Sequence, residues 1–124
     1  MQKIIIVGIG GFIGATLRYL ISIQSNKILG VFLPYGTLIA NVLACFLIGF
    51  FIEGSLEVFN ISPNMKLFLT TGFLGGLSTF STFSYETMAI LSSNFLLAGF
   101  NILLNLSFGM LGIWVGKYVI QLIK

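Results

Sequence analysis

Residues 72–84 read GFLGGLSTFSTFS and lie midway along an apolar segment that runs from about residue 65 to about residue 91. In this stretch, two adjacent glycines are followed by five hydroxyl residues. Glycine loosens a helix, and Ser or Thr hydroxyls bind the carbonyls that loosening frees. The stretch therefore predicts a break near residues 75–79, and carbonyls exposed by a break inside protein can hold a cation. A kink that serves packing alone explains the glycine content equally well.

The rest of the chain supplies three more apolar segments. The four segments span about residues 3–23, 33–52, 65–91 and 95–123. Each is long enough to cross a hydrocarbon core of about 30 Å, which takes roughly 20 helical residues. Loop-forming residues separate them at Gln24–Lys27, Glu53–Asn64 and Ser92–Asn94. We therefore expect an all-α integral membrane protein in which residues 1–124 form a single domain of four transmembrane helices, the third broken near its middle.

The composition excludes several classes of protein. Of the 124 residues, 57% are hydrophobic and 7% are charged, whereas about a quarter of a soluble domain is charged. The six Lys and Arg residues are scattered and form no patch for nucleic acid. The chain has no His, and its single Cys45 lies in an apolar run, which argues against a zinc-type centre and a disulfide within the chain. Without His, and without a Ser or Asp pair at catalytic spacing, an enzyme is not expected.

The N-terminal glycines imitate a dinucleotide-binding turn. Gly8, Gly10 and Gly14 follow an apolar run, but their spacing is GxGxxxG and not GxGxxG. The acid that binds the ribose normally follows about 20 residues later, and the first acid here is Glu53. A doubly wound fold also needs charged outer helices, which this composition does not supply.

The basic residues give a weak orientation signal. With four crossings, both termini lie on the same side as the loop between the second and third helices. That side carries four basic residues and the opposite side two: Lys3, Lys66, Lys117 and Lys124 against Arg18 and Lys27. A bias this weak permits insertion in both orientations, and hence an antiparallel pair.

Small residues recur at four-residue spacing in all four segments. The pairs are Gly10 and Gly14, Ala40 and Ala44, Gly72 and Gly76, and Gly112 and Gly116. Membrane helices use such pairs for close packing, so we expect them mainly to hold the helices together.

Two polar residues stand out in the first two segments. Arg18 is the only charge embedded in the first helix, and it either reaches the membrane interface or lies at an aqueous vestibule. Asn41 brings two N–H donors to an apolar helix. Its amide either makes an interhelical hydrogen bond or binds an anion.

The third segment carries an aromatic and hydroxyl face. Phe80 and Phe83 lie three residues apart and share this face with Ser84 and Thr87. Aromatic rings are positive at their edges, so two rings presented edge-on replace part of a small anion's hydration, although packing explains most Phe pairs at this spacing. Glu86, the only acid well inside a segment, is a candidate proton carrier, gate or interface-facing residue.

The fourth segment carries a polar stripe. Asn101, Asn105 and Gly109 recur every fourth residue along one face of the expected helix. The stripe either lines a polar path or binds another helix.

Three motifs resemble those of the Fluc family of fluoride channels, also called CrcB proteins. They are GGFIGA at residues 10–15, continuing through Arg18 and Tyr19, then Gly36-Thr37-Leu38 with Asn41, and TGFLGGLSTFSTFS at residues 71–84. With the length and the four-helix layout, the resemblance covers nearly the whole chain, and the third motif is the most specific.

The resemblance implies a fluoride-selective channel that exports fluoride across the prokaryotic plasma membrane. It implies an antiparallel, dual-topology homodimer with two pores at the subunit interface. Phe80 and Phe83 would be the pore-lining rings, Asn41 a polar pore residue, and Ser81 and Thr82 hydroxyl donors along the path.

The resemblance also implies a buried structural Na⁺ on the dimer axis. The backbone carbonyls of Gly75 and Ser78 from both subunits would hold this ion. Arg18 would lie near an aqueous vestibule, and Glu86 near the far end of the pore.

The fourth segment departs from the family pattern. Gly109 and Ile113 stand where family members commonly carry Ser or Thr, which leaves Asn105 as the nearest polar residue for this part of the path.

Two other functions fit parts of the sequence. A small proton-coupled exporter of cationic drugs needs an embedded carboxylate, usually early in the chain. The first helix here contains Arg18 and no acid, so Glu86 alone supports that reading. A non-transporting scaffold accounts for the small-residue pairs but not for the hydroxyl-rich stretch with two phenylalanines.

Overall fold

Helices make up nearly the whole chain, as the sequence predicts. The computed structural model describes residues 1–124 and contains no β-strand. In chain order the elements are α1 (Gln2–Leu29), α2 (Tyr35–Glu57), α3 (Pro63–Leu67), the π-helical η1 (Phe68–Leu74), α4 (Gly75–Leu77), α5 (Phe80–Leu91) and α6 (Phe95–Ile123). Three of them, α1, α2 and α6, are long and apolar enough to cross a membrane.

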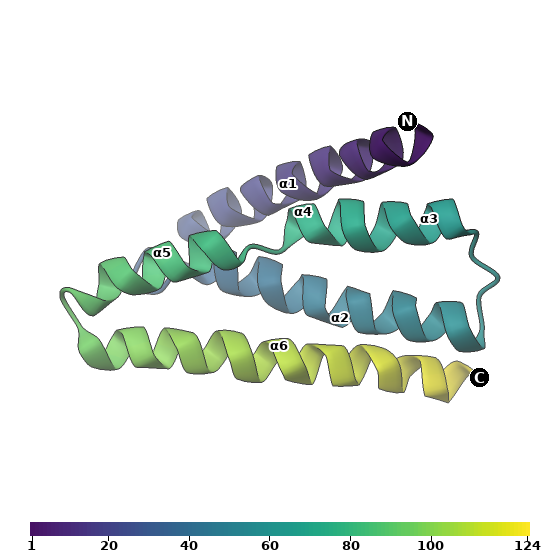
Figure 1. Ribbon diagram of the computed structural model, residues 1–124. Helices are drawn as coiled ribbons and strands as arrows, with labels where there is room; N and C mark the ends of the chain where they lie inside the picture. Colours follow the sequence, from purple (N-terminus) through teal and green to yellow (C-terminus); the bar gives the residue numbers. More distant parts are fainter.

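The helices lie roughly parallel and antiparallel along one long direction (Figure 1). Both termini and the α2–α3 connection lie at one end, and the α1–α2 and α5–α6 connections lie at the other. Within this arrangement α2 packs against α6, and α1 packs against η1 and α4. Within the segment from α3 to α5, the elements α3, η1 and α4 lie beside α1, whereas α5 packs mainly against α6.

The first helix is longer than the sequence predicts. We expected a helix end near residue 23 and a loop at Gln24–Lys27, but α1 continues to Leu29. Polar residues can continue a helix beyond its apolar segment when their side chains lie at the membrane interface or pack against other residues. Ser25 of this extension is buried, so it packs inside the structure. The helix ends where Gly30 takes a φ of 79°, a conformation that glycine adopts without steric cost.

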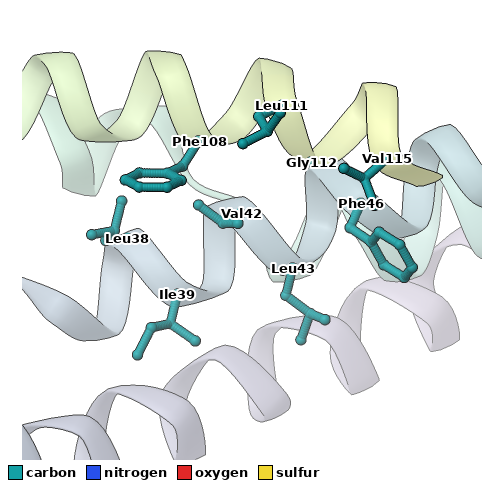
Figure 2. A pocket seen from close by; sticks show the side chains of 9 residues that line it. All are labelled: Leu38, Ile39, Val42, Leu43, Phe46, Phe108, Leu111, Gly112 and Val115. Atoms are coloured by element: carbon teal, nitrogen blue, oxygen red, sulfur yellow. The ribbon is translucent and has the colours of Figure 1, made fainter. Parts of the chain in front are cut away.

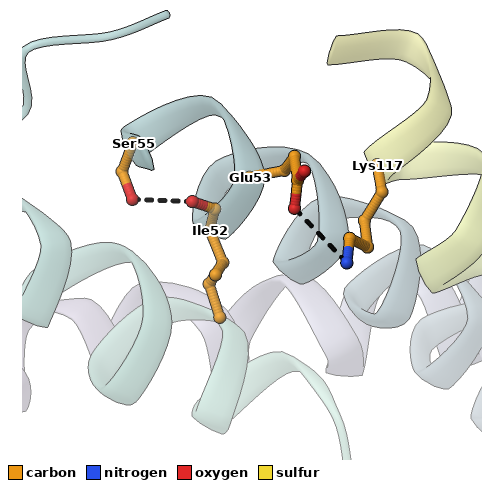
Figure 3. Close-up of polar contacts among 4 residues, drawn as sticks. All are labelled: Ile52, Glu53, Ser55 and Lys117. Atoms are coloured by element: carbon orange, nitrogen blue, oxygen red, sulfur yellow. Dashed lines mark hydrogen bonds and ion pairs between the residues drawn. The ribbon is translucent and has the colours of Figure 1, made fainter. Parts of the chain in front are cut away.

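The second helix is also longer, ending at Glu57 and not near residue 52. Two acids near its end pair with lysines in or next to α6: Glu53 Oε2 lies 3.4 Å from Lys117 Nζ (Figure 3). Glu57 pairs with Lys124, the residue after α6. The hydrogen bond to the Glu57 carboxylate raises the pKa of the Lys124 ammonium. These ion pairs join the ends of α2 and α6. Helix α2 therefore continues through residues 53–57, which the sequence predicts to be a loop.

The expected third helix is divided into several elements between Pro63 and Leu91. Ser62 caps the start of α3 by accepting the Met65 N–H at 3.2 Å. Residues 68–74 then widen into the π-helical turn η1. Between α4 and α5 the backbone is extended at Ser78 (φ −79°, ψ 156°) and Thr79 (φ −152°, ψ 116°).

Glycine-mediated contacts hold neighbouring helices together, as the small-residue spacing predicts. A Cβ added at Gly10 would lie 2.7 Å from the Phe68 carbonyl oxygen and 2.8 Å from the Phe73 nitrogen, both in η1. A Cβ at Gly116 would collide with the backbone of α2. Backbone therefore lies against backbone at both contacts, which only small residues permit.

Candidate functional site

The extended backbone at residues 78–79 borders a polar cavity of about 220 Å³. Side chains from α2, α5 and α6 converge on it. Its lining residues are Asn41, Cys45, Ser78, Thr79, Phe80, Phe83, Asn105 and Leu106. The cavity thus brings together the predicted pore residues Asn41, Phe80 and Phe83, the carbonyl-bearing Ser78, and Asn105 of the polar stripe.

Asn41 binds the extended backbone directly. Its Oδ1 accepts the Thr79 N–H at 2.8 Å, and its Nδ2 donates to the Thr79 carbonyl at 3.3 Å and to Asn105 Oδ1 at 3.1 Å. In an uninterrupted α-helix the Thr79 N–H would bond to the carbonyl of Gly75. The Asn41 amide therefore takes the place of helical hydrogen bonding where the extended residues interrupt it.

The Thr79 side chain starts the next helix. Its Oγ1 accepts the Thr82 N–H at 3.2 Å and donates to Thr82 Oγ1 at 3.0 Å, while Ser81 Oγ lies 3.5 Å away. This is an N-cap, and it orients α5 relative to the extended residues. Ser81 and Thr82 themselves are exposed on the surface of the single chain.

The two phenylalanines contact each other but differ in burial. Their ring centroids lie 5.9 Å apart with an interplanar angle of 53°. Phe83 is 9% exposed and packs inside the chain, whereas Phe80 is 79% exposed and projects from it. One ring therefore borders the cavity from within, and the other extends the same aromatic surface outward.

Arg18 reaches the extended backbone from α1. Its Nη1 donates to the Ser78 carbonyl at 3.4 Å, and the Ser78 hydroxyl donates to the Leu74 carbonyl at 3.0 Å. Ser78 and Gly75 also line a second cavity, of about 260 Å³, on the η1 side. The structure therefore places the Arg18 guanidinium beside the carbonyl predicted to hold a cation.

Glu86 lies apart from this group. Its Oε1 accepts the Thr37 hydroxyl at 3.0 Å, and its Oε2 is buried without a hydrogen-bond partner. The residue lines a separate cavity of about 300 Å³, together with residues of the α1–α2 connection such as Pro34 and with Tyr85. Glu86 is therefore not among the residues that surround Asn41.

The polar stripe of α6 has two distinct parts. Asn105 lines the cavity and contacts Asn41, whereas Asn101 is fully buried and donates to Thr87 Oγ1 at 2.9 Å. Gly109 faces Cys45, and Ile113 lines the second cavity. The stripe therefore both borders the cavity and binds α5.

A larger cavity, of about 520 Å³, lies on the other side of α2. Figure 2 shows its lining side chains, which include Leu38 and Val42 of α2 and Phe108 and Leu111 of α6. Eight of its nine lining residues are hydrophobic, so it offers no group that could replace the water around an ion.

Sequence reasoning missed one N-cap and two side-chain pairs among the candidate residues. Thr79 was identified only as one hydroxyl among several, although threonine is a favoured N-cap residue before an apolar helical segment. Thr87 was placed on the aromatic face, but its partner Asn101 was not foreseen, and neither was the pairing of Thr37 with Glu86. No sequence pattern identifies such partners, because they depend on how separate helices pack.

Comparisons with known proteins agree with the motifs. The family model described as "CrcB-like protein, Camphor Resistance (CrcB)" matches residues 5–117. A "Fluoride-specific ion channel FluC" of Clostridium perfringens is 53% identical over 127 residues, covering 99% of both chains. Proteins of the same name are 48% identical in Clostridium novyi, covering 94% of both chains, and 42% identical in Dehalococcoides mccartyi, covering all of this chain and 96% of that one. Their names describe ion channels and not enzymes, and together with the three membrane-spanning helices these matches mean that the chain is a membrane protein that belongs to the CrcB family.

Proposed function

We propose that this protein is a fluoride-selective ion channel that exports fluoride across the cell membrane. Relatives named fluoride-specific ion channels match the chain over nearly its full length. The observation that carries the proposal within the structure is the polar cavity, where the amides of Asn41 and Asn105 meet Phe80 and Phe83 beside extended backbone.

The chemistry of the cavity suits a small anion. Fluoride is tightly hydrated, so a narrow path must replace its water with close hydrogen-bond donors. The amides of Asn41 and Asn105 and the rings of Phe80 and Phe83 line the cavity, and we assign their N–H groups and ring edges as these donors. The hydroxyls of Ser81 and Thr82 follow on α5. Lys and Arg do not line the cavity, so no full positive charge holds the ion too tightly for release.

We propose that two copies of the chain form an antiparallel homodimer with two pores at their interface. In the single chain Phe80, Ser81 and Thr82 are exposed on α5, in the apolar segment that the sequence predicts to cross the membrane. Hydroxyls facing hydrocarbon are unfavourable, so a second copy covering this face accounts for their exposure. The ring of Phe80 then closes a path that Phe83 borders from within its own chain.

The two orientations can be tested in cells. A cysteine replacing Lys124, in a Cys45→Ser background, is expected to react with a membrane-impermeant maleimide from both sides of the cell membrane. The reason is that an antiparallel pair places the two C-termini on opposite sides. Reaction from one side only, in all molecules, contradicts the antiparallel arrangement.

A structural Na⁺ at the dimer axis completes the proposal. Oxygens are the ligands that hard cations prefer. Ser78 is extended, and the helical Gly75 does not receive the Thr79 N–H at its carbonyl because that N–H donates to Asn41. In the proposed dimer, the same two carbonyls of the second copy complete the ligand set. The Arg18 guanidinium already donates to the Ser78 carbonyl, and a bound cation would share that oxygen with it.

The alternative is a small proton-coupled exporter of cationic drugs that uses Glu86. The buried and unpartnered Oε2 of Glu86 is the observation that favours it. Against it, Glu86 lies in a different cavity from Asn41 and Phe83. An exporter of this kind predicts proton-dependent cation transport and no fluoride flux.

Fluoride efflux from liposomes tests the proposal directly. Purified protein in vesicles loaded with fluoride is expected to release it when a potassium ionophore balances the charge, as a fluoride electrode records. Vesicles loaded with chloride serve as the control and are expected to show no comparable release. Absence of fluoride flux from protein that is verified as folded and dimeric would reject the channel.

The same assay tests the aromatic residues. Phe83→Ile is expected to slow fluoride efflux about tenfold or more, because an aliphatic side chain has no positive edge to offer an anion. Phe108→Ile makes the same chemical change in the apolar cavity between α2 and α6 and serves as the control. Equal efflux from the two variants contradicts a role for ring edges.

A further inference from the structure

A continuous chain of hydrogen bonds joins α5, α6 and α2 to the extended backbone; we name it the amide relay. It consists of Phe83 O, Thr87 Oγ1, the side-chain amides of Asn101, Asn105 and Asn41, and Thr79 N. From donor to acceptor, its bonds are Thr87 Oγ1 to Phe83 O (2.7 Å), Asn101 Nδ2 to Thr87 Oγ1 (2.9 Å), Asn105 Nδ2 to Asn101 Oδ1 (3.3 Å), Asn41 Nδ2 to Asn105 Oδ1 (3.1 Å) and Thr79 N to Asn41 Oδ1 (2.8 Å).

The two ends of the relay fix its direction. The Phe83 carbonyl can only accept a hydrogen bond, so the Thr87 hydroxyl donates to it and presents a lone pair to Asn101. At the other end, the Thr79 N–H can only donate, so Asn41 must present its oxygen there. Between these ends the nitrogen of each amide donates to the next member toward Thr87, and its oxygen accepts from the next member toward Thr79. Two backbone carbonyls also accept from these nitrogens: Asn105 Nδ2 donates to the Asn101 carbonyl at 3.0 Å, and Asn41 Nδ2 donates to the Thr79 carbonyl at 3.3 Å.

Rotating any one amide by half a turn would break this order. A rotated Asn41 would place its oxygen against Asn105 Oδ1 and its NH₂ group against the Thr79 N–H. Both contacts are repulsive, and the partners on α6 are buried: Asn101 is 0% and Asn105 8% exposed. Water is therefore excluded from Asn101 and cannot satisfy it in another orientation.

We propose that Asn101, oriented by Thr87, is a positioning residue that holds the Asn105 and Asn41 amides in this orientation at the cavity, together with the backbone of Asn101 and Thr79. It does not itself line the cavity, so its effect passes through Asn105. The functional part of this inference rests on the proposed function, because the orientation matters when the cavity receives an anion.

The orientation decides which atoms meet an anion. With the relay intact, the Asn41 NH₂ group lies between the Thr79 carbonyl, at 3.3 Å, and Asn105, at 3.1 Å. An anion that replaces the longer of these bonds receives an N–H donor. In a rotated amide the same place would hold an oxygen, which repels an anion.

Side-chain amide NMR tests the relay without any flux measurement. In protein labelled with ¹⁵N at its seven asparagines, Thr87→Val is expected to shift the NH₂ signals of Asn101, Asn105 and Asn41. The valine keeps the shape of threonine but removes the acceptor of Asn101. A shift confined to Asn101 overturns the proposal. If Thr87→Val does not fold, Asn101→Leu interrupts the relay at a second point. It is expected to shift the NH₂ signals of Asn105 and Asn41.

A matched control separates the relay from the local bond. Thr16 Oγ1 donates to the carbonyl four residues earlier, Phe12 O, at 2.7 Å, just as Thr87 does to Phe83. Thr16→Val therefore removes an equivalent bond on an exposed helix face outside the relay. It is expected to leave all three amide signals unchanged, and movement of these signals in this variant contradicts a specific role for Thr87.

Fluoride efflux then tests the consequence for transport. Thr87→Val and Asn101→Leu are each expected to lower efflux per folded protein by about tenfold. The double variant is expected to be no slower than the slower single variant, because both changes interrupt one chain of bonds. Thr87→Ser keeps the hydroxyl and is expected to restore efflux. The positioning role is overturned if the losses in the double variant are fully additive, or if Thr87→Ser does not restore efflux. Absence of efflux from the unmodified protein rejects the channel, and the NMR result then decides the relay.

Discussion

Gly14→Ala is expected to destabilise the fold severely, lowering the free energy of unfolding by about 3 kcal/mol or more. A Cβ at this position would collide with the Phe73 carbonyl oxygen and lie 2.8 Å from the Leu77 nitrogen. Both are backbone atoms, so no side-chain rotation relieves the contact. Separating α1 from η1 and α4 would also pull Arg18 from the Ser78 carbonyl. Thermal unfolding and the yield of monodisperse protein in detergent measure the effect.

Gly8→Ala provides the matched control in the same helix. A Cβ at Gly8 would find no atom within 4 Å. This variant is expected to be neutral or more stable by up to about 1 kcal/mol, because alanine favours helix more than glycine does. Equal stability of Gly14→Ala and Gly8→Ala would contradict the backbone contact between α1 and the segment that contains the cavity.

Apolar segment length was sufficient to predict the helices but not where they end. The starts near residues 35 and 95 follow from Pro34 and from Asn94, which caps α6 by accepting the Leu97 N–H at 3.0 Å. The ends of α1 and α2 lie beyond the apolar segments because Ser25 packs inside the structure and because Glu53 and Glu57 pair with lysines of the C-terminal segment. Glu53 shows why the sequence was not sufficient there: its partner Lys117 lies on another helix.

The residue types of the site could be predicted, but their partners could not. Asn41 stood out because an amide in an apolar helix needs a partner. That this partner is the backbone of Thr79 follows from the packing of α2 against the extended residues, and local sequence does not record it. The sequence also did not predict that residues 68–74 form the π-helical η1. The backbone of η1 lies against Gly10 of α1, and Gly72 within η1 lies against Val7 of α1.

Asn41→Leu is expected to reduce fluoride efflux per folded protein about 100-fold or more, the largest effect expected of a single change at the cavity. Leucine matches the size of asparagine but removes the amide that Asn105 and Thr79 share. It also leaves the Thr79 N–H and carbonyl without their side-chain partner. Each unsatisfied buried group costs about 1–3 kcal/mol, so the unfolding free energy is expected to fall as well.

The loss of transport can be separated from the loss of stability by comparing two measurements on each variant. Efflux is normalised to the folded fraction, which thermal unfolding gives independently. Asn60→Leu makes the same chemical change in the exposed α2–α3 connection and is expected to alter neither quantity. If Asn41→Leu lowered only stability and kept normal efflux per folded protein, Asn41 would be a structural brace for the extended backbone and not a donor to the ion. If it lowered efflux while Asn101→Leu did not, the ion would depend on the Asn41 amide itself and not on the relay that orients it.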